Sequence, residues 1–120
     1  VERVSITLPQ AQVIFAEILE QSIRSILEDN GHTYSRMLAQ IPTRQKELLY
    51  AIASEGKADK VLGSAFIKRH SLQSASSVQA ALKKLLALDF ITMEESYYTL
   101  PDRFMSLYIK LRQNPSMRLL

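Results

Sequence analysis

The feature that most constrains the fold is a series of three short segments with helix-forming patterns, each bounded by residues that start or stop helices. The segments are Arg44–Ser54, Ala65–His70 and Ala75–Leu88. In the first and the last, apolar residues recur at the spacing of an amphipathic helix. Thr43, Ser64 and Ser74 precede the three segments as N-cap residues. Isolated helices shorter than about 12–15 residues are marginal in water, so these segments must pack on one another.

Two β-type segments follow the third helix. They are Phe90–Met93 and Tyr97–Leu100, and three residues join them. Enrichment in Thr, Tyr, Ile and Phe with so short a connection indicates a β-hairpin. A hairpin is marginal by itself, so this one needs the apolar faces of the helices. Three helices followed by a hairpin are the element order of a winged helix-turn-helix.

A helical segment precedes this arrangement. Its apolar periodicity begins at Gln10 and ends at the stop signal Asn30-Gly31, and a second short helix is expected at Tyr34–Gln40. The sequence therefore predicts a mainly α fold with a small β-hairpin, a winged helix-turn-helix preceded by a helical segment. The expected divisions are a helical lead at residues 1–41, a winged-helix domain at 42–112, which ends in a helix at Arg103–Arg112, and a tail at 113–120.

The charge of the chain is unevenly distributed. Fifteen Lys and Arg against twelve Asp and Glu give a net charge of only +3. Residues 1–30 carry five acids against two bases, a net of −3, whereas residues 31–89 carry nine bases against four acids, a net of +5. The basic middle segment favours ordinary solvated helix faces, and a phosphate-facing surface is the sharper alternative.

Seven residues are candidates for nucleic-acid binding. The second helix of a helix-turn-helix commonly enters the DNA major groove, where Gln reads adenine, Lys reads guanine and small side chains permit close approach. The expected outward face of the helix at Ala75–Leu88 presents Ser76, Gln79, Ala80 and Lys83, and the expected phosphate contacts are Lys68, Arg69 and Lys84. Two observations weigh against this interpretation. Glu94 and Glu95 at the hairpin tip would repel DNA, and a polar helix face of this composition is common on any protein.

Four segments resemble a known family. Arg44–Ala53, Ala65–His70, Ser74–Leu85 and Tyr98–Tyr108 are similar to the C-terminal part of the prokaryotic AAA+/STAND-like P-loop ATPases, the archaeal type found also in Bacteroidetes. The closing pattern of that family is matched at Tyr98, Asp102 and Phe104. It departs at Met105 and at Tyr108, where tryptophan is usual. The resemblance implies that residues 1–41 are the end of an ATPase lid and residues 42–112 the winged helix after it.

The resemblance also implies a longer parent protein that binds ATP and Mg²⁺, whereas this chain has no G-x-x-x-x-G-K-[ST] phosphate cradle. Val1 is not an initiator methionine, so we expect a piece of that longer protein. His32, expected in a loop, and His70 have no metal-ligand partners at a suitable spacing. We therefore expect no catalytic, cofactor-binding or metal-binding residues here. The expected function is a non-catalytic module that docks DNA or protein or regulates the ATPase. The alternative is a free-standing winged-helix transcription regulator.

The expected partners follow from these patterns. They are the ATPase core of the parent chain, DNA, a protein partner, and a second copy of the chain bound through the first helix. That helix has an apolar stripe, and such a stripe left exposed favours dimerisation. No membrane is expected, because no apolar run approaches the ~20 residues that span a bilayer. A chain without cysteine suits the reducing cytoplasm.

Overall fold

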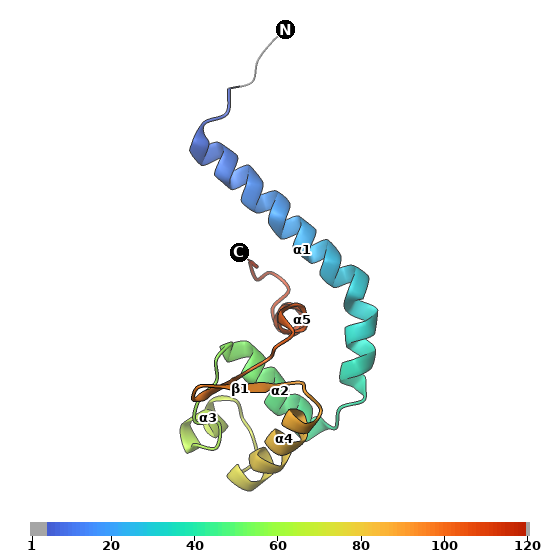
Figure 1. Cartoon of the computed structure of the whole chain (residues 1–120), viewed down its shortest axis with the longest axis vertical. Coiled ribbons are helices and arrows are strands. Elements are labelled where there is room, and N and C mark those ends of the chain that lie inside the picture. Colours follow the sequence, from blue (N-terminus) through green and yellow to red (C-terminus); the bar gives the residue numbers. More distant parts are fainter. Residues whose placement is uncertain (1–4, 120) are drawn as a thin grey trace.

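A computed structural model describes residues 5–119 of the chain (Figure 1). Its elements in this range are α1 (Leu8–Ala39), α2 (Thr43–Glu55), α3 (Ser64–Arg69), α4 (Ala75–Ala87), β1 (Thr92–Glu94), β2 (Tyr97–Thr99) and α5 (Arg103–Gln113). The prediction of a mainly α fold with a β-hairpin is confirmed. Figure 1 shows α2 to α5 gathered at one end, while α1 extends far beyond them, so the molecule measures 69 × 29 × 24 Å.

The long helix α1 begins with a capping box. The backbone N–H of Gln10 donates to the Thr7 hydroxyl oxygen at 3.3 Å, and the Gln10 side-chain oxygen accepts from the Thr7 N–H at 2.9 Å. Pro9 lies in the first turn. A backbone N–H there would have no acceptor within the helix, so proline loses no hydrogen bond at this position. These contacts fix the start of the helix close to the predicted position.

The predicted helix end at Asn30-Gly31 is wrong, because α1 runs through both residues without a break. The Asn30 side chain donates to the carbonyl oxygen four residues earlier at 2.8 Å and so stays within the helix. On either side, Leu27 and Leu38 are buried against the rest of the fold. A glycine inside a helix costs about 1 kcal/mol relative to alanine, and burial of these two leucines offsets that cost.

The core is built around α2. Leu49, Ile52 and Ala53 are completely buried there, and α2 packs against both α4 and α5. The spacing of apolar residues predicts an inner face of α4 made of Val78, Ala81, Leu82, Leu85 and Leu88, and this prediction is confirmed at the first four positions. It is wrong at Leu88, which remains 49% exposed because α4 ends at Ala87 and Leu88 is its C-cap.

Helix α5 is rotated relative to the prediction. The apolar spacing predicts one side of the helix made of Phe104, Leu107, Tyr108 and Leu111. The buried residues are instead Met105, Tyr108 and Ile109, and Phe104 is 42% exposed. The helix packs between α2 and α1, so two neighbours set the face that it buries. The Tyr108 ring lies against the ring of Tyr34 in α1, with 5.4 Å between their centroids.

The predicted helix caps are partly confirmed. Ser74 caps α4, where its hydroxyl accepts a hydrogen bond from a backbone N–H three residues on at 3.2 Å. Thr43 and Ser64 are not caps, because α2 and α3 each begin one residue earlier than predicted. The N-cap positions belong to Pro42 and Gly63, and neither makes a side-chain hydrogen bond to its helix.

The hairpin is anchored to the loop that follows α2. Strands β1 and β2 pair antiparallel, and the turn between them has two residues, Glu95 and Ser96, where three were predicted. Glu95 adopts the left-handed backbone conformation, with φ 54°. Ala58 and Tyr98 exchange two backbone hydrogen bonds, at 2.9 and 2.7 Å. The loop after α2 therefore pairs with the edge of β2 away from β1 through one isolated bridge, and this bridge fixes the hairpin to the core.

Two glycine substitutions test this fold. Gly31→Ala should stabilise the domain by about 0.5–1 kcal/mol, because a methyl group there lies 3.4 Å from the Tyr108 ring and the residue is helical. Gly56→Ala should destabilise it by about 1 kcal/mol or more, because Gly56 has φ 75° although the space around it is open. Urea unfolding followed by circular dichroism measures both changes. Destabilisation by Gly31→Ala would contradict an unbroken α1.

Candidate nucleic-acid interface

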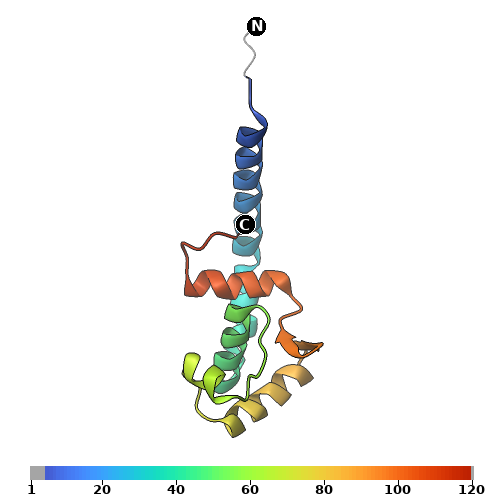
Figure 2. The same cartoon turned by 90° about the vertical axis from the view of Figure 1, so that its left-hand side faces the viewer.

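The outer surface of α4 is uncovered. Figure 2 shows α4 at the end of the molecule opposite the projecting part of α1, with α3 towards one of its ends and the hairpin towards the other. All seven residues predicted to bind nucleic acid are exposed, namely Lys68, Arg69, Ser76, Gln79, Ala80, Lys83 and Lys84. Because the buried side of α4 faces α2, its polar side faces solvent. The structure thus presents these side chains at the surface that a helix-turn-helix protein offers to DNA.

The turn between α3 and α4 is fixed by backbone geometry. Ser71 has φ 54°, and the N–H of Leu72 donates to the Ile67 carbonyl oxygen at 2.9 Å. Leu72 packs on the core from within this turn, as its apolar side chain in a polar stretch predicts. The start of α4 is therefore held in place from both sides, by this turn and by the Ser74 cap.

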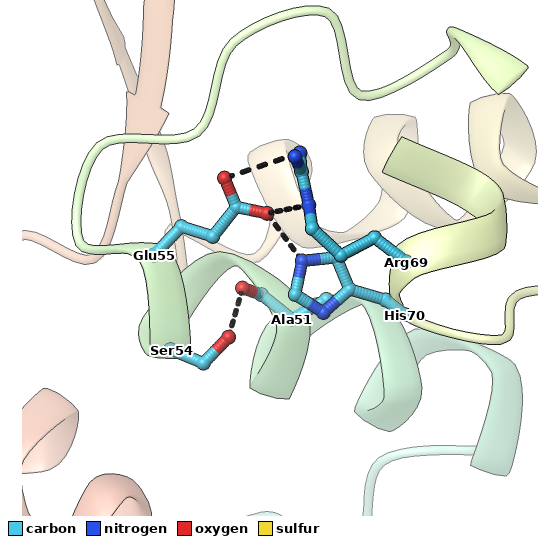
Figure 3. Close-up of polar contacts among 5 residues, drawn as sticks. All are labelled: Ala51, Ser54, Glu55, Arg69 and His70. Carbon is cyan, nitrogen blue, oxygen red and sulfur yellow. Dashed lines mark hydrogen bonds and ion pairs between the residues drawn. The ribbon is translucent and has the colours of Figure 1, made fainter. Parts of the chain in front are cut away.

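Arg69 is the one candidate cation that already has a partner within residues 5–119. Its guanidinium makes two hydrogen bonds to the Glu55 carboxylate, 3.2 Å from Nε and 3.4 Å from Nη2 (Figure 3). The guanidinium also lies over the Phe66 ring, 5.7 Å from its centroid. Glu55 ends α2, so this pair joins the last turns of α2 and α3. Glu55 occupies two of the five N–H donors of Arg69 and offsets its charge, which weakens any contact of Arg69 with a phosphate.

The two histidines have structural positions. His70 is the C-cap of α3, and its Nε2 contacts the same Glu55 carboxylate (Figure 3). Its ring packs on Phe66 with 4.6 Å between centroids. His32 lies inside α1, so its predicted place in a loop is wrong. Within residues 5–119, no group of three or more His, Asp or Glu side chains is placed to hold a metal ion.

The acidic hairpin tip is present as predicted. Glu94 ends β1 and Glu95 occupies the turn, and both are exposed. The Tyr97 hydroxyl donates to the Glu94 carboxylate at 3.2 Å. A hairpin that contacts DNA next to the recognition helix would meet phosphates, so these two carboxylates oppose such contact.

A second cationic region lies at the base of the hairpin and was missed in the sequence. A cleft there is lined by Lys57 from the loop after α2 and by Arg103 and Lys110 from α5, together with Tyr97. The Lys57 ammonium lies over the Tyr97 ring, 5.2 Å from its centroid. No short motif could reveal this cleft, because packing of α5 beside β2 brings together residues from separate parts of the chain.

The two tyrosines whose pKa values are shifted, Tyr34 and Tyr50, lie away from α4. Burial raises the pKa of the Tyr34 hydroxyl above its ordinary value, and the Asp102 carboxylate adds to this. Burial also raises the pKa of Tyr50, against a smaller lowering by the Arg112 guanidinium. Both groups belong to the packing of α1, α2 and α5.

No helix in the described part of the chain combines the length and apolarity needed to cross a bilayer.

The Glu55–Arg69 pair can be tested by a double-mutant cycle on stability. Glu55→Ala and Arg69→Ala should couple by about 0.5–1 kcal/mol, because the geometry is bidentate and the Glu55 side chain is only 23% exposed. The Arg44–Glu47 pair within α2 is the control, with side chains 51% and 37% exposed and an expected coupling near about 0.3 kcal/mol. If the two pairs gave equal coupling energies, the Glu55–Arg69 pair would be no stronger than an ordinary exposed ion pair, and this prediction would be wrong. Urea unfolding supplies both values.

One comparison with known proteins identifies a family. A family model described as a probable winged helix domain matches residues 32–111, which are 80 of the 120 residues. The match begins inside α1 and ends within α5. No curated protein and no solved structure matches the chain.

Proposed function

Because the chain belongs to the family of probable winged helix domains, we propose that it is a non-catalytic binding module whose ligand is duplex DNA. The observation that carries the proposal is the uncovered polar face of α4, opposite a face that is buried on α2. An α-helix fits the major groove of DNA, which is about 12 Å wide. The fixed start of α4 supports this role, because a reading helix must be held at a constant angle.

The proposed contacts divide into base contacts and phosphate contacts. Gln79 pairs with adenine and Lys83 with guanine, while Ser76 and Ala80 are small enough to let the helix approach the bases. Lys68 and Lys84 take phosphates, since within residues 5–119 neither forms an ion pair. Arg69 adds a further phosphate contact when it leaves Glu55.

The hairpin has no part in this proposed interface. Glu94 and Glu95 keep its tip away from the DNA backbone, so the number of phosphate contacts stays small. A module with few phosphate contacts and a net charge of +3 binds weakly by electrostatics alone. We expect a dissociation constant for non-specific DNA near 10⁻⁶–10⁻⁴ M, as an order of magnitude at physiological salt.

The proposal is tested by the double variant Gln79→Ala, Lys83→Glu. DNA affinity should fall about 10- to 100-fold and the salt dependence should become shallower, because a base contact and a cation are lost. Fluorescence anisotropy with a labelled duplex at several salt concentrations measures both quantities. The control is Arg118→Glu in the exposed tail, far from α4, which changes the charge by as much as Lys83→Glu (Figure 1). If the double variant bound no worse than this control, recognition by α4 would be wrong.

A substitution that adds positive charge gives a second measurement in the same experiment. Glu95→Lys replaces an exposed carboxylate at the hairpin tip by a cation and should raise DNA affinity several-fold. If neither the unsubstituted chain nor this variant bound any duplex, the DNA proposal would be overturned. Docking of a protein would then be the remaining function for a winged helix domain.

We propose further that this module is the C-terminal part of a P-loop ATPase whose DNA or protein contacts it provides or whose activity it regulates. Support comes from the resemblance of Arg44–Ala53, Ala65–His70, Ser74–Leu85 and Tyr98–Tyr108 to that family. ATP and Mg²⁺ then belong to the parent chain in the cytoplasm. The coding sequence directly upstream of Val1 tests this. A G-x-x-x-x-G-K-[ST] motif preceding the module supports the ATPase, and a start codon there favours a free-standing transcription regulator.

A further inference from the structure

The N-terminal half of α1, with Ile6 before it, is a largely exposed apolar surface, and every residue of Leu8–Leu19 is exposed. Eight large apolar side chains are between 40% and 73% exposed, which are Ile6, Leu8, Val13, Ile14, Phe15, Ile18, Leu19 and Ile26. The first buried residue of α1 is Leu27. Figure 1 shows this half of the helix extending beyond the other elements. Apolar surface of this extent on one helix indicates a partner.

A regular seam runs along this half of α1. Leu8, Phe15, Leu19 and Ile26 follow one another at intervals of seven, four and seven residues, which is the spacing of a coiled coil. Gln12 and Ser22 occupy the two remaining positions of the same seam. We call these six residues the α1 seam. It contains no charged residue.

The rest of the domain leaves the α1 seam accessible. The C-terminal tail contacts α1 through Glu20, whose carboxylate accepts from the Leu119 N–H at 2.7 Å, and through Arg24, which donates to the Met117 carbonyl oxygen. Helical geometry at 100° per residue places Glu20 and Arg24 on the side of α1 away from the seam. A second helix can therefore lie along the seam without displacing the tail.

We propose that the α1 seam pairs with the α1 seam of a second copy of the chain, in antiparallel orientation, to form a two-fold homodimer. In one register, Leu8 faces Ile26 of the other copy and Phe15 faces Leu19. In the same register Gln12 faces Ser22. Every apolar residue of the seam then meets an apolar residue, and the two polar residues meet each other. A two-fold interface requires a self-complementary patch of this kind.

Charge and exposure both favour a second copy as the occupant. An uncharged seam can face itself, whereas a patch of one charge would repel its own copy. The four apolar side chains of the seam and Ile18 beside it are each between 40% and 73% exposed, and pairing two copies would remove all of them from water. Ala11, Ala16 and Ile18 flank the seam and widen the apolar contact.

The dimer is tested by sedimentation equilibrium on the chain of residues 1–120 without substitutions. Phe15→Glu should raise the dimer dissociation constant by at least about a hundredfold, because each dimer would bury two unpaired carboxylates. The control is Gln21→Glu, which places the same charge on the same helix outside the seam and should leave the dimer intact. Circular dichroism should show the same helix content in both variants. An unsubstituted chain that stays monomeric at high micromolar concentration would overturn the proposal.

The orientation is tested by cysteine cross-linking, which is clean because the chain has no cysteine of its own. Leu8→Cys and Ile26→Cys should form a disulfide with each other when the two variants are mixed, and neither should cross-link with itself. Self-cross-linking of Leu8→Cys would show a parallel pair and overturn the register. The seam lies far from α4, so failure of the dimer leaves the DNA-binding measurement unaffected, and the reverse holds too.

Discussion

Burial of the apolar face of α2 is the interaction on which the rest of the structure depends. Leu49 and Ile52 are fully buried in α2, which packs against both α4 and α5. Each buried leucine or isoleucine contributes about 1.5–3 kcal/mol, which short helices do not obtain alone. The same packing turns the polar side of α4 to solvent, so the candidate interface is a consequence of the core.

The positive charge that this candidate interface offers to phosphates is smaller than its number of basic residues suggests. Arg69 is held by Glu55, so the cations free for phosphate in residues 5–119 are fewer than the composition indicates. The acidic hairpin tip removes the contact that a basic wing would provide. Both features favour weak electrostatic attraction to DNA, so the proposed binding would depend mainly on the exposed side chains of α4.

Helix α1 has two halves with different environments. The half from Leu27 to Ala39 belongs to the core and carries the helix through Gly31, whereas in the half before it every residue of Leu8–Leu19 is exposed. Tertiary packing overrides a local stop signal in the first case. In the second, the apolar surface has a coiled-coil spacing, and a second copy would bury it as the core buries the other half.

The sequence by itself determined the order of elements from α2 onward, the Ser74 cap, most of the inner face of α4 and the exposure of the seven candidate residues, because these follow from local periodicity and capping chemistry. Only the tertiary structure decided the unbroken course of α1, the face that α5 buries, the Glu55–Arg69 pair and the cleft at Lys57, Arg103 and Lys110. The physical reason is that the first group of features depends on neighbouring residues, whereas the second depends on contacts between distant segments. Periodicity reports which residues share a face of one helix, but the partner of that face is set by packing between segments far apart in the chain.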